Sequence, residues 1–364
     1  MSENNAKQQE IGAALRQVID PTTSKDVVSL GYVRSVGFAD GEAVVEYQLP
    51  DHLAGSAIEQ EIRKRTNAAT LMVDGVEKVE IRVRAPAAAA PQAKALPGVK
   101  HVIAVGAGKG GVGKSTIAVL LAAGLQRAGK TAAVLDADVY GPSVPKLTGT
   151  EGEQPYADEQ GRIVPPESRD GIKVMSMGFL VPPDEAIVWR GPMAQKYVKE
   201  FIDRGNWGDL DFLIVDLPPG TGDIPLTLAQ SIPLTGAVVV CTPQDVALID
   251  AVKALRMYQK LGVEALGFVE NMSYYISPAG GDREYIFGKG GVERAAKKNN
   301  VPFLGGLALC QLIRESGDAG TPMDCFTHAP EYIVDELDAI VANLLEQVER
   351  HAAEAAPLPT IRMR

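Results

Sequence analysis

The sequence predicts an α/β protein with a doubly wound, mostly parallel sheet, preceded by a small α+β domain. The first observation is a series of nearly continuous apolar runs alternating with helical segments, a pattern typical of parallel strands buried on both faces. The second is an Ala- and Pro-rich stretch that separates this series from a shorter N-terminal segment. The third is a hairpin pattern inside that segment. The apolar runs occupy residues 101–105, 131–138, 212–216, 237–241, 265–271 and 303–309.

Composition divides the chain into four parts. Its 364 residues suffice for two domains, since a domain averages about 150 residues. Residues 85–98, APAAAAPQAKALPG, carry a single charge, and their prolines interrupt any helix, so we interpret them as a linker. Residues 1–84 form the predicted small α+β domain, residues 99–350 the predicted α/β domain, and residues 351–364 a tail.

The small domain is predicted to have the element order α-β-β-α-β. Its first helix ends before Asp20, because a residue that precedes proline disfavours the helical conformation. Two alternating runs flank Ala39-Asp40-Gly41, which is a hairpin turn signal. No cluster of catalytic residue types occurs here. The predicted helices span 11–18 and 56–67, and the predicted strands span 33–38, 43–48 and 79–84.

The charge balance narrows the class of partner. The chain has 36 Lys and Arg against 46 Asp and Glu, which gives a formal net charge of −10. Nucleic-acid binding and attachment to acidic membranes both rely on clustered positive charge. We therefore expect neither nucleic acid nor a membrane as the main partner.

The cysteines and the N-terminus indicate the compartment. The chain has three cysteines, Cys241, Cys310 and Cys325, and none of them belongs to a CxxC pair. A disulfide scaffold is therefore disfavoured, and a reducing compartment is expected. The polar start, MSENNAKQQE, has no apolar segment of the kind found in signal peptides. Since no apolar run is long enough to span a bilayer, we expect a cytoplasmic protein.

A phosphate-binding loop is the strongest motif. Residues 108–115 read GKGGVGKS and satisfy the pattern G-x-x-x-x-G-K-[ST] between an apolar strand and a predicted helix over 115–128. Such a loop aims backbone N–H groups at phosphate oxygens, and the helix N-terminus adds partial positive charge. We expect Lys114 to reach the β- and γ-phosphates of ATP and Ser115 to bind Mg²⁺. The predicted nucleotide-binding residues are Gly108, Lys109, Gly110, Gly111, Val112, Gly113, Lys114, Ser115 and Thr116.

Three carboxylates end two of the apolar runs. Asp136 and Asp138 are two residues apart in LDADVYGPS, so on a continuing strand they share a face. We assign Asp136 to Mg²⁺, which it binds through water. Asp138 and Lys114 are both assigned to catalysis, and Asp138 is the group that orients the attacking water. One of the pair could instead serve a helix cap or turn. Asp216 ends FLIVD and is also assigned to Mg²⁺, directly or through water. The glycines of the following DLPPGTGD allow a switch loop.

Two further lysine-containing segments allow two interpretations each. Lys109 stands at the start of the loop, where it could be a solvated surface lysine or a catalytic charge supplied to the phosphates across a dimer interface. The string GKGGV recurs over 288–292, but Glu293 and Arg294 follow where a phosphate loop needs Gly, Lys and Ser. We therefore interpret that segment as the glycine-rich start of a helix over 293–298.

With GKGGVGKST, LDADVYGPS, VWRGPM, DLPPGTGD, TPQD and ENMS in this order, residues 99–345 resemble the Mrp family of P-loop ATPases. The N-terminal segment, with DPTTSKDVVSLG, resembles the PaaD-like domain that precedes the ATPase in many members. The resemblance implies a cytoplasmic iron–sulfur cluster carrier that serves apoproteins or assembly factors. It also implies a homodimer with ATP at its interface, Lys109 acting across that interface, and Asn271 reading the adenine with Pro243 nearby.

The resemblance fails at one place. The family usually carries a CxxC pair after ENMS, which holds a [4Fe–4S] cluster jointly with the partner chain. Ser277 and Gly280 stand at those two positions, and neither can replace a thiolate on iron. No Fe–S ligand is therefore identified, although Cys310 and Cys325 of two chains would supply four thiolates.

Three functions stay open: a cluster carrier, a cluster-free dimeric ATPase scaffold, and a positioning ATPase of the Min or partition class. The last is disfavoured because such ATPases need a basic membrane-binding helix or a basic DNA-binding face. The helix predicted over 331–350 is acidic overall.

Overall fold

The computed structural model describes residues 3–21, 23, 25–39, 41–48, 57–84, 96–180, 191–277 and 280–355. The chain forms two compact units, Met1–Pro91 and Gln92–Arg364. Residues 85–95 of the predicted linker, residues 356–364 of the predicted tail and the hairpin residue Asp40 lie outside the described part of the chain. Each unit is described by itself.

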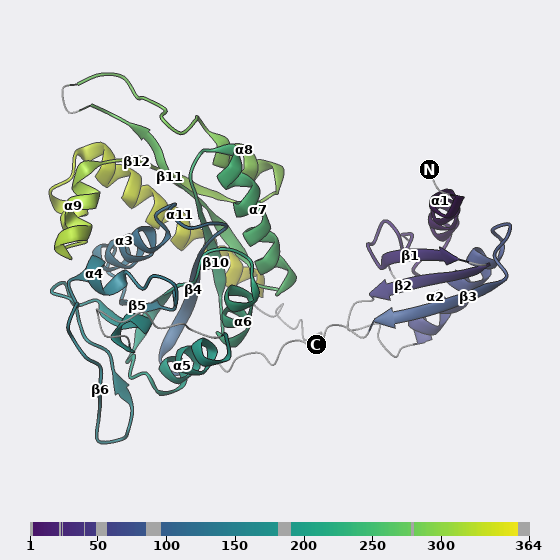
Figure 1. Cartoon of the computed structure of the whole chain (residues 1–364), viewed down its shortest axis with the longest axis horizontal. Helices are drawn as coiled ribbons and strands as arrows, with labels where there is room; N and C mark the ends of the chain where they lie inside the picture. The colour runs from purple at the N-terminus through teal and green to yellow at the C-terminus, as the bar shows by residue number, and fades with distance from the viewer. Residues whose placement is uncertain are drawn as a thin grey trace, which may run out of the picture. The chain divides into compact units, whose positions relative to one another are not determined.

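The smaller unit has the predicted order α-β-β-α-β (Figure 1). Strand β2 pairs antiparallel with β1 and parallel with β3, so β2 is central. The first helix ends at Leu15, earlier than predicted, because the chain extends to bridge Ile19 with Asp26. A core of its own, which includes Ile11, Tyr47 and Ile62, fills the space between sheet and helices. The elements are α1 (Glu3–Leu15), β1 (Val33–Ala39), β2 (Glu42–Gln48), α2 (Ala57–Leu71) and β3 (Lys78–Arg84).

The larger unit contains a seven-stranded parallel sheet in the order β12-β11-β10-β4-β9-β5-β8. All six predicted strands are confirmed. The sequence analysis missed edge strand β8 and a two-stranded hairpin of β6 (Tyr156–Ala157) and β7 (Ile163–Val164). The seven strands are β4 (Val99–Ala107), β5 (Ala132–Asp136), β8 (Lys173–Ser176), β9 (Leu210–Asp216), β10 (Gly236–Cys241), β11 (Ala265–Tyr275) and β12 (Phe303–Leu309).

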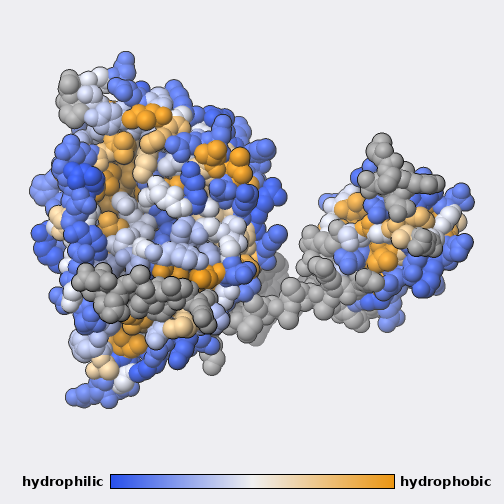
Figure 2. Space-filling model, viewed as in Figure 1, coloured by the Kyte–Doolittle hydropathy of each residue, from blue (hydrophilic) through white to orange (hydrophobic). Residues whose placement is uncertain are grey.

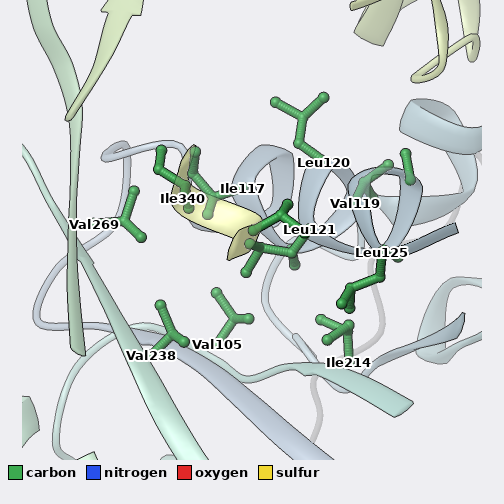
Figure 3. Packing of buried hydrophobic residues seen from close by; sticks show 14 of the residues in the cluster. Val105, Ile117, Val119, Leu120, Leu121, Leu125, Ile214, Val238, Val269 and Ile340 are labelled. Carbon is green, nitrogen blue, oxygen red and sulfur yellow. The ribbon is translucent and has the colours of Figure 1, made fainter. Parts of the chain in front are cut away.

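Helices cover both faces of this sheet, as a doubly wound fold requires. On one face, Ile117 and Leu121 of α3 pack with Ile340 of α11 against Val105 and Val238 of the strands (Figure 3). The opposite face has a second core, to which helices α5, α6 and α7 contribute. The helices are α3 (Lys114–Arg127), α4 (Val144–Thr148), α5 (Gly191–Arg204), α6 (Asp223–Ser231), α7 (Asp245–Lys260), α8 (Gly291–Lys298), α9 (Gln311–Ala319), α10 (Asp324–Thr327) and α11 (Glu331–Ala355), with a 3₁₀ turn at Met177–Leu180.

The strand order places a binding site. Strand β4 is the first of the sheet in the chain, and its neighbours β10 and β9 lead toward opposite edges. In doubly wound sheets, ligands bind at such a switch point, beyond the carboxyl ends of the strands. Polar residues cover much of the visible face of this unit, interrupted by separate apolar patches (Figure 2). No helix in the described ranges is both long and apolar enough to cross a membrane.

Candidate nucleotide site

The loop between β4 and α3 has the backbone of a phosphate cradle. Gly111 and Gly113 adopt left-handed φ angles of 81° and 82°, which side chains rarely accept. Gly108 lies against helix α7, where an added Cβ would be 2.0 Å from the carbonyl carbon of Asp250. The glycines therefore serve turn geometry and close packing, and α3 begins directly after the loop at Lys114.

Lys114 lies among acidic side chains. Its Nζ atom is 2.5 Å from Asp216 Oδ1 and 3.3 Å from Asp138 Oδ2, and it also donates to the Ser115 hydroxyl at 3.2 Å. The side chain is only 6% exposed. Burial alone would lower the pKa of Lys114, but the charges of Asp216 and Asp138 outweigh burial and raise it. The structure therefore brings together four of the predicted site residues, from α3, from β9 and from the loop after β5.

Asp136 has structural hydrogen bonds. Its Oδ1 accepts from the N–H of Asp138 at 3.1 Å, and its Oδ2 accepts from the N–H of Val144 at 3.2 Å and from the Ser176 hydroxyl at 2.9 Å. Val144 is the first residue of α4, so Asp136 caps that helix. Burial and the nearby charge of Asp216 raise the pKa of Asp136. The cap-or-turn alternative thus has direct support, while a bond to Mg²⁺ through water stays a prediction.

Asp216 supplies a vacant acceptor. The side chain is fully buried, and its Oδ2 atom has no hydrogen-bond partner among the described residues. Burial raises the pKa of Asp216, although the ammonium of Lys114 opposes that effect. An unpaired buried carboxylate oxygen is costly, which is a reason to expect a cation or water there.

The charges of this buried cluster suit a magnesium–nucleotide complex. Asp136, Asp138 and Asp216 surround the single ammonium of Lys114, so the buried charges do not cancel. Within the described ranges, no group of three or more His, Cys, Asp or Glu could hold a metal ion by itself. Mg²⁺ commonly uses one or two protein ligands and completes its shell with water and phosphate oxygens. The residues present fit that ion.

The loop that follows Asp216 is tied to the phosphate loop's strand. Leu217 N–H donates to the Val105 carbonyl at 3.1 Å, and Gly220 N–H donates to the Ala107 carbonyl at 2.8 Å. Gly220 adopts a left-handed φ of 95°. Lys109, at the start of the phosphate loop, is partly exposed and forms no ion pair with a described residue. Its action across an interface stays a prediction.

Two residues predicted to lie near the base contact loops. The side-chain amide of Asn271 donates to the Val112 carbonyl of the phosphate loop at 2.9 Å. Pro243 lies beside the second glycine-rich segment, where a Cβ on Gly291 would be 2.6 Å from the Pro243 carbonyl oxygen. Neither contact tests adenine reading, which stays a prediction for both residues.

The second GKGGV segment starts helix α8, as interpreted from the sequence. Glu270, which the sequence analysis missed, accepts from the N–H of Val292 at 3.0 Å and from the Ser273 hydroxyl at 2.5 Å. It thus occupies the N-terminus of α8 with a buried carboxylate. The only sequence signal was an acid at the end of an apolar run.

The segment after ENMS folds back on itself. Tyr275 pairs antiparallel with Glu284, and the Gly280 N–H donates to the Ser277 carbonyl at 2.9 Å. Its base is held because the Tyr274 hydroxyl donates to Glu336 of α11. Pro278 and Ala279, and residues 181–190 with VWR of the VWRGPM motif, lie outside the described residues.

The cysteines offer no substitute for the missing pair. Cys241 and Cys325 are each 1% exposed, and only Cys310 is partly exposed. Burial raises the pKa of Cys241 to about 12 and also raises that of Cys325, which disfavours the thiolates that iron requires. Because Cys325 is covered by its own chain, the four-thiolate site from two chains is disfavoured.

Comparison with known proteins bears on this geometry. Residues 98–345 match the family described as NUBPL iron-transfer P-loop NTPase, and residues 8–83 match the family described as iron-sulfur cluster assembly protein. The chain belongs to the NUBPL iron-transfer P-loop NTPase family. These two matches cover the two structural units separately.

Members of this NTPase family are similar over most of the chain. A protein of Synechocystis named iron-sulfur cluster carrier protein is 46% identical over 85% of this chain and 89% of its own length. One of the same name from Escherichia coli K12 is 42% identical over 93% of this chain and 90% of its own. The iron-sulfur cluster transfer protein NUBPL of Dictyostelium discoideum is 47% identical over 63% of this chain and 71% of its own.

Solved structures show the same NTPase fold. A nucleotide-binding protein from Archaeoglobus fulgidus, in complex with ADP, is 37% identical, with a TM-score of 0.57 over 64% of this chain and 90% of that chain. The cell division ATPase MinD of Pyrococcus furiosus is 19% identical, with a TM-score of 0.51 over 68% of this chain and 98% of that chain. The latter likeness concerns the fold alone.

Proposed function

We propose that this chain binds and hydrolyses ATP with Mg²⁺ and carries iron–sulfur clusters to target apoproteins in the cytoplasm. The observation that carries the ATPase part is the burial of Lys114 between Asp216 and Asp138, at the point where the glycine-rich loop meets α3. The names of its relatives support the cluster part.

The placement of these groups supports hydrolysis. The backbone N–H groups of the loop bind the phosphates, and Lys114 exchanges its carboxylate partners for the β- and γ-phosphates. Ser115, with Asp216 and Asp136, would hold Mg²⁺, which would supply positive charge to the phosphates. Asp138 then orients the attacking water. Positioning and electrostatics thus carry the catalysis.

A homodimer completes the proposed site. Lys109 lies at the head of the loop, partly exposed and without an ion-pair partner in the described ranges, so its ammonium is free to serve a neighbouring chain. A cation supplied by a partner stabilises the charge of the transition state in related phosphoryl transfers.

A second function has its own observation: a cluster-free dimeric ATPase that acts as a scaffold or switch in cluster assembly. Ser277 and Gly280 occupy the folded-back segment where the family resemblance implies two cysteines, and the described residues form no metal-holding group. In that case, the nucleotide site works as above and clients dock without receiving a cluster from this chain.

Anaerobic reconstitution with iron and sulfide separates the two functions. The carrier proposal predicts visible charge-transfer absorption and bound iron in the wild-type chain, and transfer of that iron to an apoprotein. A matched control restores the missing spacing with Ser277→Cys and Gly280→Cys together. A wild-type chain that stays colourless while this control binds iron, with ATP turnover in both, would establish the cluster-free function instead.

A further inference from the structure

Asn271 makes an unusual long-range contact. It belongs to β11, and its side-chain amide donates to the carbonyl of Val112, which is 159 residues away along the chain. In the sheet, β10 lies between β11 and β4, the strand that leads into the phosphate loop. The bond therefore reaches past β10 and joins the phosphate loop to a strand that is not its neighbour.

This contact fixes the direction of a peptide group in the loop. In a planar trans peptide, the carbonyl and the following N–H point in opposite directions. Holding the Val112 carbonyl toward Asn271 therefore aims the Gly113 N–H away from Asn271. The Val112 side chain is buried in the core, so Val112 is held both by its side chain and by its carbonyl. The fit is close, since a Cβ on Gly113 would lie 2.1 Å from Asn271 Nδ2.

The residues on either side of Asn271 have buried contacts and an irregular backbone. Glu270, the preceding residue, accepts from the N–H of Val292 and from the Ser273 hydroxyl. Met272, the following residue, has a left-handed φ of 56°, which is uncommon for a non-glycine residue. The regular pairing of β11 with β12 is interrupted between Asn271 and Tyr275. The strand thus departs from regular geometry at Asn271, where it meets the loop.

We infer that Asn271 is a positioning residue that holds the phosphate loop in its binding conformation through the Val112 carbonyl. This role is separate from any contact with the base, because the hydrogen bond is made to the backbone of the loop itself. The inference rests on the nucleotide binding proposed above. It predicts that Asn271 contributes to the affinity for a ligand that has phosphates and no base.

The test compares Mg²⁺–ATP with Mg²⁺–tripolyphosphate by titration calorimetry. Asn271→Ala and Asn271→Leu each remove the donor and leave the Val112 carbonyl unpaired. Since a hydrogen bond of this kind contributes about 1 kcal/mol, both variants should bind tripolyphosphate about three- to tenfold more weakly. Asn343→Ala is the matched control, because it removes an asparagine amide that donates to a backbone carbonyl, that of Leu304 in β12, away from the phosphate loop. Its tripolyphosphate affinity should equal that of the wild type.

The outcomes separate cleanly. Variants of Asn271 that lose ATP affinity but keep wild-type tripolyphosphate affinity would show a base contact only and overturn the inference. A wild-type chain that binds neither probe would overturn the proposed function. If both variants fail to fold, the wild-type chain decides by amide exchange in protein labelled with ¹⁵N-asparagine. Slow exchange of the Asn271 side-chain amide without nucleotide supports the hydrogen bond to the Val112 carbonyl. Exchange at the rate of exposed asparagines rejects it.

Discussion

At the scale of single residues, the site is governed by one buried ammonium among three buried carboxylates. Burial raises the pKa of Asp136 and Asp216, and the charge of Lys114 opposes that rise. Lys114 therefore serves two purposes in the same position. Its charge lowers the pKa of both acids and so favours the ionised forms that accept Mg²⁺, and in the proposed mechanism it supplies positive charge for the phosphates.

Replacing Lys114 with methionine tests both purposes. Lys114→Met should abolish ATP turnover, and it should lower the free energy of unfolding at pH 7.5 by about 3 kcal/mol, because it leaves buried carboxylates unpaired. With their folded-state pKa values raised further, these acids favour the native state most at low pH and lose that contribution as pH rises. The deficit against wild type should therefore shrink at pH 5. Urea unfolding at both pH values measures it.

The exposed Lys130, in the turn after α3, provides the comparison. Lys130→Met should change the unfolding free energy by less than about 0.5 kcal/mol at either pH. A deficit in Lys114→Met that stayed the same at pH 5 would argue against ionised partners around Lys114.

At the scale of elements, the strands of the sheet could be predicted from their buried apolar runs. Features that depend on contacts between distant segments could not be predicted. The runs over 101–105 and 237–241 indicate buried strands without further information. Strand β8 was missed because it has only four residues at the sheet edge. The role of Asp136 as a cap of α4 depends on a five-residue helix with little periodicity of its own. The role of Glu270 was missed because its partner Val292 lies 22 residues away along the chain.

The phosphate loop offers a test of packing between elements. Gly108→Ala places a methyl group 2.0 Å from the carbonyl carbon of Asp250, so the loop and α7 must separate. Overpacking of this kind should lower the free energy of unfolding by about 1–3 kcal/mol and weaken ATP binding. Thermal unfolding and ATP titration measure the two effects.

Gly110 is the control in the same loop. A methyl group there would be 4.0 Å from its nearest neighbour, Pro219, and Gly110 lacks a left-handed φ. The free energy of unfolding of Gly110→Ala should therefore lie within about 0.5 kcal/mol of the wild-type value. Equal losses of stability in both variants would show that the loop's backbone freedom matters, and its approach to α7 does not.

At the scale of the whole molecule, each unit has its own hydrophobic core and its own family match. The groups proposed to bind and hydrolyse ATP all come from the larger unit. That unit contains every predicted site residue, and Lys109 among them is proposed to act on the site of a neighbouring chain. In the proposed homodimer, the assembly of two chains is the step that completes the ATPase.

Subunit complementation tests this step. Lys109→Ala should lower turnover at least about 10³-fold if Lys109 acts as a cation on the transition state. Mixed with Lys114→Ala, which is inactive but keeps Lys109, it should recover about a quarter of wild-type turnover, because half of randomly paired dimers then hold one complete site of two. If Lys109 acts within its own chain, no pairing contains a complete site and mixing restores nothing. Light scattering on the same samples confirms that the chains pair, so the turnover of the mixture alone decides which chain Lys109 serves.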